Sequence, residues 1–452
     1  MKLRRPPLQI DPENPFAGAF YKRVHFAKSL TSLLRSAQDG MVVFVNAPWG
    51  AGKTTFAQMW RAYLNKEKLD TISFDAYASD YVADPFISFT GEIMELLEKR
   101  IAQNKGVQEI TRNFREAAVS FLQHAAPVAT KIAVKVATAG ILNGTELKGL
   151  GEALASSSDD VSDATAEAVR RRIDHYSEEK AVLANFRTKL RQVAALVRDT
   201  QGFPLTIIVD ELDRCRPSFA LELLERIKHL FDVEGVVFIL LVNRAQIETY
   251  VRTVYGNEVE AATYLQKFGD LFVDLPMGQS QPNDWSLRTF FETLIEELEI
   301  EPPDSHNLLA QDLAFFGEHF GLTLREAEHV AKTLALDYAA LTTGDFNYYP
   351  VAAFFAIVKV KNPTIFSKIR SQEWSGKDVL MALRFEKLKA QVNSDEGRHG
   401  FSVIEASLLN DVEIEALAPE SSLSKIAKRM RGTFGPALTS AVVCSRLERF
   451  RF

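Results

Sequence analysis

The sequence has little cysteine: of its 452 residues only Cys215 and Cys444 are cysteines, and they lie far apart without CxxC spacing. A disulfide framework and a zinc site are therefore not expected. The eight histidines are scattered through segments of helical pattern, without a Ser-His-Asp or Cys-His constellation. Nuclease and protease chemistry is thus not supported, and the cysteine usage is typical of a protein in the reducing cytoplasm.

The sequence also lacks an excess of positive charge. It holds 53 lysines and arginines against 59 aspartates and glutamates, which gives a formal net charge of -6. Proteins that coat nucleic acid normally rely on a basic surface that releases counterions. A nucleic-acid partner is therefore possible through a local basic patch but is not indicated.

No uncharged apolar run is long enough to cross a membrane. Residues 1–11 contain no apolar segment of the kind that a signal peptide needs. The most apolar long stretch, 125–142, contains Lys131 and Lys135 and is shorter than the roughly 20 residues of a spanning helix. We expect a packed helix there, with a helix lying on a membrane surface as the alternative, and neither export nor membrane insertion is expected.

Five short segments have the length of strands and alternate with segments of helical periodicity; four of them are mainly apolar runs, and 71–74 mixes apolar residues with Thr71 and Ser73. The five segments cover residues 41–45, 71–74, 205–209, 236–242 and 271–275. Apolar runs of this length are typical of strands buried on both faces, and strands that alternate with helices are typical of a parallel sheet. The sequence therefore predicts an α/β fold around a five-stranded parallel sheet.

The same patterns predict how the chain is divided. Residues 1–104 and 201–280 are expected to form the core that contains the sheet. Residues 105–200 are helical or small and polar, with an acidic loop at 156–163, and predict a helical insertion. From 281 to 452 the periodicity is helical, which predicts a helical C-terminal region.

A phosphate loop follows the first apolar run. Residues 47–54 read Ala-Pro-Trp-Gly-Ala-Gly-Lys-Thr and match the pattern G-x-x-x-x-G-K-[ST] with alanine in the first position. The two glycines let the backbone turn tightly and aim its N–H groups at phosphate oxygens, and the following helix adds the positive end of its dipole. A chance glycine-rich turn is the alternative, but the flanking strand and helix favour a phosphate loop.

The predicted nucleotide-binding residues are Pro48, Trp49, Gly50, Ala51, Gly52, Lys53, Thr54 and Thr55. Among them, Lys53 is expected to contact the β and γ phosphates as a catalytic residue, and Thr54 to bind Mg²⁺.

An acidic pair follows the apolar run at 205–209, at the carboxyl end of a predicted strand. Asp210 is expected to hold Mg²⁺, and Glu211 to orient or deprotonate the attacking water. Helix capping by the pair is the alternative. Asp213 is a rival for the catalytic role, and a bond to the adjacent Arg214 or Arg216 is the alternative for it.

Two of these segments resemble the signatures of the KAP family of P-loop NTPases. They are the phosphate loop with its preceding Pro48 and Trp49, and the run Asp-Glu-Leu-Asp-Arg-Cys that ends at Cys215. The second signature usually begins Asp-Asp, so Glu211 is a conservative departure that leaves open which carboxylate is catalytic. The resemblance covers residues 10–335.

The resemblance implies further features of the fold and the site. It implies the strand order 5-1-4-3-2, ATP with Mg²⁺ as cofactors, a helical lid and a tendency to form homo-oligomers. By the same resemblance Asn243 matches a polar residue that senses the γ-phosphate, and Arg325 a sensor arginine of the lid. Arg244 or Arg252 would act as an arginine finger across a subunit interface.

The sequence therefore favours an ATPase that acts as a regulatory or assembly-driving switch. Bacterial KAP proteins are similar to phage-exclusion proteins, so the resemblance implies a cytoplasmic role in an antiphage defence complex with a protein effector. The alternative is a scaffold that binds ATP with little turnover and holds an effector in place.

Overall fold

The structure is a computed structural model that describes most of the chain. The described residues are 5, 8–19, 21, 23–37, 39–81, 85–101, 105–125, 163–231, 233–277, 286–301, 306–341, 349–390, 395–434 and 440–449. The apolar stretch at 125–142 and the acidic loop at 156–163 lie outside them, except for one end residue each.

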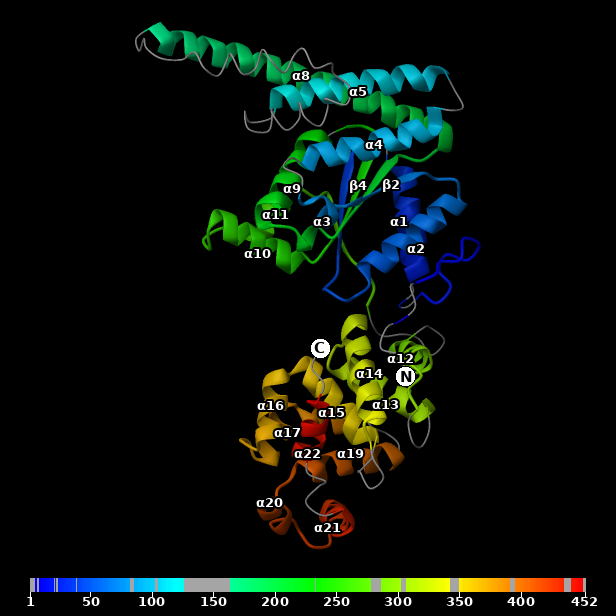
Figure 1. Cartoon of the computed structure of the whole chain (residues 1–452), viewed down its shortest axis with the longest axis vertical. Helices are drawn as coiled ribbons and strands as arrows, with labels where there is room; N and C mark the ends of the chain where they lie inside the picture. Colours follow the sequence, from blue (N-terminus) through cyan, green and yellow to red (C-terminus); the bar gives the residue numbers. More distant parts are fainter. Residues whose placement is uncertain are drawn as a thin grey trace.

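A five-stranded parallel sheet forms the centre of the N-terminal part of the chain (Figure 1). Its strands are β1 (Met41–Asn46), β2 (Thr71–Asp75), β3 (Leu205–Asp210), β4 (Val236–Val242) and β5 (Leu271–Asp274). Their order is β2-β3-β4-β1-β5, and every neighbouring pair is parallel. Counted from β5, this is the order 5-1-4-3-2, so the predicted fold is confirmed.

Helices cover both faces of the sheet (Figure 1). One face packs against α1 (Arg23–Ser36) and α2 (Lys53–Lys66), in a core that includes Val43, Ile208 and Ile239. Every residue of β3 and β4 is buried. Because both faces of these central strands are covered, their sequences are almost continuously apolar rather than alternating.

The opposite face packs against helices from several parts of the chain. They are α4 (Pro85–Ile101), α5 (Lys105–Ala125), α8 (Asp163–Gln201), α9 (Pro217–Phe231), α10 (Arg244–Tyr255) and α11 (Ala261–Leu265). Two short elements, α3 (Ala76–Ser79) and the 3₁₀ helix η1 (Leu212–Arg214), follow β2 and β3. Phe114 of α5 and Phe186 of α8 belong to this core, with ring centroids 5.5 Å apart. Part of the predicted 105–200 insertion thus shares a core with the sheet, and the domain limits stay a prediction.

The C-terminal helices build a second core, separate from the sheet (Figure 1). They are α12 (Leu287–Glu297), α13 (His306–His319), α14 (Leu324–Ala339), α15 (Tyr349–Lys361), α16 (Pro363–Ser371), α17 (Gly376–Ala382), α18 (Phe385–Lys389), α19 (Asp395–Leu408), α20 (Asp411–Glu415), α21 (Ser422–Phe434) and α22 (Ser440–Leu447). Residues Pro350–Val358 of α15 are all buried, as expected for a helix that is apolar on every side. A search of the described helices finds none with the length and apolarity needed to span a membrane.

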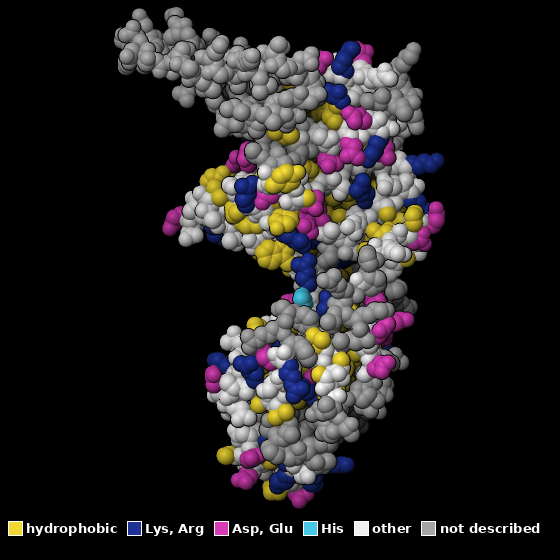
Figure 2. All heavy atoms as spheres, in the orientation of Figure 1, with side chains coloured by type: hydrophobic (Ala, Val, Ile, Leu, Met, Phe, Trp, Pro, Cys, Tyr) yellow, Lys and Arg dark blue, Asp and Glu magenta, His cyan; other side chains and the backbone are white. Residues whose placement is uncertain are grey.

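The molecule narrows between the sheet body and the helical body. On the face drawn in Figure 2, lysine and arginine side chains gather at this narrowing. The sheet body meets α14 at the phosphate loop, where the backbone N–H of Arg325 donates to the carbonyl oxygen of Gly50 at 3.1 Å. The start of α14 is therefore held directly against the loop.

Candidate nucleotide-binding site

The phosphate loop connects β1 to α2 through two glycines in the left-handed region. Gly50 has a φ of 80° and Gly52, which precedes the first turn of α2, has a φ of 81°. A Cβ atom on Gly50 would lie 2.6 Å from the Cβ of Arg325. Glycine is therefore needed at position 50 both for the backbone conformation and for the close approach of α14.

Lys53 folds back onto the loop and is buried. Its Nζ donates to the carbonyl oxygens of Ala47 at 2.9 Å and Pro48 at 3.4 Å. It also lies 3.2 Å from Oδ2 of Asp213. In this structure the lysine charge is thus balanced by the third acidic residue of the Asp-Glu-Leu-Asp run.

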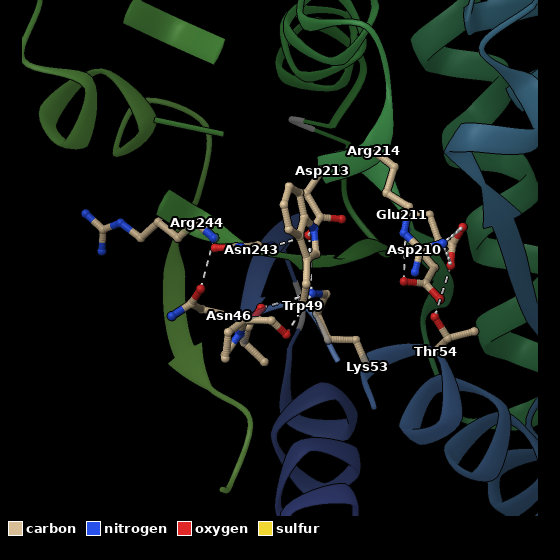
Figure 3. Close-up of polar contacts among 12 residues, drawn as sticks. Asn46, Trp49, Lys53, Thr54, Asp210, Glu211, Asp213, Arg214, Asn243 and Arg244 are labelled. Atoms are coloured by element: carbon tan, nitrogen blue, oxygen red, sulfur yellow. Dashed lines mark hydrogen bonds and ion pairs between the residues drawn. The ribbon is translucent and has the colours of Figure 1, made fainter. Parts of the chain in front are cut away.

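Asp213 connects several elements around the loop. The indole Nε1 of Trp49 donates to its Oδ2 at 2.9 Å, and the backbone N–H of Asn243 donates to the same oxygen at 2.8 Å (Figure 3). The hydroxyl of Tyr250 donates to its carbonyl oxygen at 2.8 Å. The side chain is 1% exposed. Asp213 therefore ties the phosphate loop to the junction of β4 and α10.

The arginines beside Asp213 have other partners. Arg214 pairs with Glu211 at 3.1 Å, and Arg216 pairs with Asp80 at 2.9 Å. The predicted alternative for Asp213, a bond to one of these arginines, is therefore not what the structure shows.

Asp210 and Glu211 lie beside Thr54, as Figure 3 shows. The Thr54 hydroxyl donates to Oε1 of Glu211 at 3.4 Å, and the backbone N–H of Glu211 donates to Oδ1 of Asp210 at 2.8 Å. Burial raises the pKa of Asp210, although its hydrogen bonds with Thr54 and with the Glu211 amide oppose the change. Glu211 makes no side-chain capping bond. A threonine hydroxyl and carboxylates are hard oxygen donors of the kind that Mg²⁺ prefers, so this pocket fits that ion.

A cavity of about 810 Å³ joins these residues, within the range of small-molecule sites. Its lining from the loop and the acidic run is Trp49, Gly50, Gly52, Lys53, Thr54, Thr55, Asp210, Glu211, Asp213 and Arg214. The rest comes from Arg5, Leu8, Gln9, Ala17, Gly18, Ala19, Arg23, Met59, Phe290, Thr293, Glu297, Leu324, Arg325 and Glu328. The cavity thus lies between the sheet body and helices α12 and α14.

The four predicted sensor and finger residues separate into two groups. Arg325 lines the cavity, and its sensor role stays a prediction. Arg244 and Arg252 both pair with Glu248 on their own helix, and Figure 3 shows Arg244 pointing away from the loop. The backbone of Asn243 is held by Asp213, but its side chain is not among the residues that line the cavity.

Sequence reasoning missed two arginines of the cavity wall. Arg23, the first residue of α1, is buried against the phosphate loop. Arg5 forms an ion pair with Glu297 of α12 at 2.6 Å. Neither position has a sequence signal, since an arginine at a helix start or in a proline-marked lead is usually solvated.

The sheet order, the phosphate loop after β1 and the acidic residues after β3 together define a P-loop NTPase. The sequence model of the KAP family P-loop domain matches residues 23–341, and the chain belongs to this family. It is also similar to the phage T7 exclusion protein of Escherichia coli (strain K12), with 28% identity over 186 residues. That match covers 40% of this chain and 24% of the relative, so most of the relative has no counterpart in the match.

Proposed function

We propose that the protein binds ATP with Mg²⁺, hydrolyses it, and uses the cycle as a regulatory or assembly-driving switch in a bacterial antiphage defence complex. The observation that carries the nucleotide part is the charge balance of the cavity. Three of its basic side chains are matched by acidic ones: Lys53 with Asp213, Arg214 with Glu211, and Arg5 with Glu297. Among the described residues, these pairs leave three charged side chains of the cavity without a partner of opposite charge.

The remaining charges match a nucleotide and its metal. Among the described residues, the guanidinium groups of Arg23 and Arg325 have no acidic partner, and the carboxylate of Asp210 has no basic one. Two cations and one anion beside a phosphate loop complement a triphosphate chain that carries a divalent cation. Bound Mg²⁺ would neutralise phosphate charge, held by Thr54 and Asp210.

The protein side chains would divide the remaining work. Lys53 would exchange Asp213 and the loop carbonyls for phosphate oxygens, because a lysine ammonium has only three N–H donors. Glu211 would orient the attacking water and accept its proton, while Arg214 holds the Glu211 carboxylate in place. Asp213 is less suited to this role, because its Oδ2 already receives bonds from Trp49 and Asn243.

Calorimetric titration with ATP and Mg²⁺, followed by a phosphate-release assay, tests the nucleotide part. The wild-type protein should bind and turn over ATP, and Lys53→Ala should lower turnover on the order of a hundredfold or more. Lys28→Ala, on the exposed side of α1, is the matched control and should behave as wild type. A wild-type protein that binds no nucleotide would contradict the proposal.

The alternative function is a scaffold that binds ATP with little turnover. It is separated from the switch by Glu211→Gln, which keeps the side-chain shape but removes the proton acceptor. The switch predicts bound ATP with turnover lost and biological output altered. If turnover and output are both unchanged in Glu211→Gln while Lys53→Ala abolishes output, the scaffold is correct.

The defence role is supported by the similarity to a phage exclusion protein, together with family membership. We propose that the chain forms a homo-oligomer in the cytoplasm and acts on a protein effector.

Plaque counts on cells that express wild type, Lys53→Ala or Lys28→Ala test the role in defence. Light scattering with and without ATP tests whether the chain assembles into an oligomer. Equal plaque counts for wild type and Lys53→Ala would contradict the role in defence, and ATPase activity that DNA stimulates only at low salt would favour a nucleic-acid motor.

A further inference from the structure

Arg23 is the first residue of α1, and its side chain packs against the backbone of the phosphate loop. It is 2% exposed. Its Nη1 donates to the carbonyl oxygen of Gly52 at 3.1 Å, and its Nη2 donates to the carbonyl oxygen of Ala51. A Cβ atom on Gly52 would lie 2.9 Å from Nη1, so the guanidinium is packed directly against the loop backbone.

The charge of Arg23 has no counterion among the described residues. Its polar contacts are carbonyl oxygens, its Nε is buried without a hydrogen-bond partner, and the ring of Tyr21 lies 5.6 Å from the guanidinium carbon. Burial lowers the pKa of Arg23 to about 10, so the group still carries its charge at neutral pH. A buried cation without an anion is costly, and such charges are normally paired.

Another buried arginine of the same chain shows the usual solution. Arg446 donates through Nε and Nη2 to the two carboxylate oxygens of Asp337, at 2.6 and 2.9 Å. Both side chains of that pair are buried. Arg23 differs from Arg446 because no carboxylate among the described residues pairs with it, although its side chain lines the nucleotide cavity.

The position of Arg23 fits an anionic ligand. It lines the cavity together with Lys53, Thr54 and Arg325. A guanidinium has five N–H donors, and the two loop carbonyls use only two of those on Arg23. The planar fork of arginine suits phosphate oxygens, which accept two hydrogen bonds side by side.

We propose that Arg23 binds the phosphate chain of the nucleotide and is the residue that the ligand neutralises. This inference rests on the proposed nucleotide binding and adds a contact from α1, outside both sequence motifs. Arg23 donates one N–H of each Nη atom to the carbonyl oxygens of Ala51 and Gly52, and contributes the remaining N–H groups of these two atoms to the phosphates. The alternative is a structural clamp that acts on the loop alone.

Arg23→Gln separates the two roles, because glutamine removes the charge but can still donate to a loop carbonyl. The ligands are ATP and inorganic tripolyphosphate, each with Mg²⁺, and their affinities are measured by calorimetry. We expect both affinities to fall by similar factors, on the order of 10- to 100-fold. We also expect the melting temperature of the nucleotide-free protein to stay the same or rise, since a desolvated charge has been removed.

Two further variants complete the experiment. Arg198→Gln is the matched control, because Arg198 also donates to a backbone carbonyl, that of Ala37 at 2.5 Å, but does not line the cavity. It should leave both affinities unchanged.

Arg23→Lys keeps the charge but lacks the planar fork of the guanidinium, so it should weaken tripolyphosphate binding less than Arg23→Gln does. If Arg23→Gln does not fold, Arg23→Lys decides the question. In that case, wild-type affinity of Arg23→Lys for tripolyphosphate overturns the proposal.

The other outcomes have distinct meanings. A structural clamp predicts that Arg23→Gln lowers the melting temperature of the nucleotide-free protein and leaves tripolyphosphate affinity unchanged, which overturns the inference. A contact with the base or ribose predicts weaker ATP binding with unchanged tripolyphosphate binding, which also overturns it. A wild-type protein that binds neither ligand refutes the proposed nucleotide binding itself.

Discussion

The indole N–H of Trp49 donates a 2.9 Å hydrogen bond to Oδ2 of Asp213, so the two sequence motifs are joined by a direct side-chain contact. The same oxygen lies 3.2 Å from Nζ of Lys53. A change at Asp213 therefore affects the loop conformation and the charge of Lys53 together.

Asp213→Asn should destabilise the nucleotide-free protein by about 1 to 3 kcal/mol, because Lys53 stays buried and loses its acidic partner. Phosphate would supply the missing negative charge, so the rise in melting temperature on adding ATP should be larger than in wild type. Thermal melts with and without ATP measure both effects. A variant as stable as wild type, with the same response to ATP, would show that the ion pair is unimportant.

Trp49 should report nucleotide binding by fluorescence. Trp49 is 44% exposed and lines the cavity, whereas Trp60 of α2 is fully buried in the core between that helix and the sheet. Bound nucleotide changes the solvation of the ring and its bond to Asp213, so the emission should shift on titration with ATP. Trp49→Phe should remove the shift while the protein still binds ATP in calorimetry. A shift of the same size in Trp49→Phe would assign the signal to another tryptophan.

Asp210 should make the affinity for Mg²⁺-nucleotide sensitive to acid. Burial raises the pKa of this carboxyl group, and Mg²⁺ requires its ionised form. The affinity should therefore fall as the pH is lowered, at a higher pH than an ordinary aspartate with a pKa of about 3.9 would give. Calorimetry over a pH series measures this affinity. Asp210→Asn should bind Mg²⁺-ATP weakly, and its affinity should lack the fall at low pH that the Asp210 carboxyl group causes in wild type. An identical acid profile in wild type and Asp210→Asn would exclude this group.

The same carboxyl group should also cost stability in the nucleotide-free state. The pKa of Asp210 is higher in the folded chain than in the unfolded chain, so between these two pKa values the folded state binds more protons. Stability therefore falls as the pH rises through this range. Asp210→Asn should therefore be more stable than wild type at neutral pH in urea unfolding. Asp199→Asn, an exposed change on α8, is the control and should be neutral.

Gly50→Ala should separate α14 from the phosphate loop. The added Cβ would be strained at a φ of 80° and would lie 2.6 Å from the Cβ of Arg325, so the Arg325–Gly50 backbone bond must lengthen. We expect a loss of about 1 to 3 kcal/mol in unfolding free energy and weaker ATP binding. Gly91→Ala on α4 is the control, since its Cβ would meet no atom within 4 Å, and it should be neutral or stabilising by up to about 1 kcal/mol. Equal behaviour of the two variants would mean that α14 does not need this contact.

The sequence by itself determined the fold class and the place of the phosphate loop. Both depend on neighbouring residues: the apolar runs are continuous because β3 and β4 are buried on both faces, and the glycine spacing matches the backbone turn between β1 and α2. The strand order came from the family resemblance rather than from the runs themselves. The assignment of a catalytic role to Glu211 stays a prediction.

Only the tertiary structure decided which charged groups meet. Asp213 binds Trp49 and Lys53 across more than 150 positions of sequence, and no local pattern distinguishes that partner choice from a bond to Arg214. Arg23 and Arg325 come to the cavity from α1 and α14, on opposite sides of the loop in sequence. Burial and pairing depend on which segments approach in space, because the free energy of a charge is set by its surroundings rather than by its neighbours along the chain.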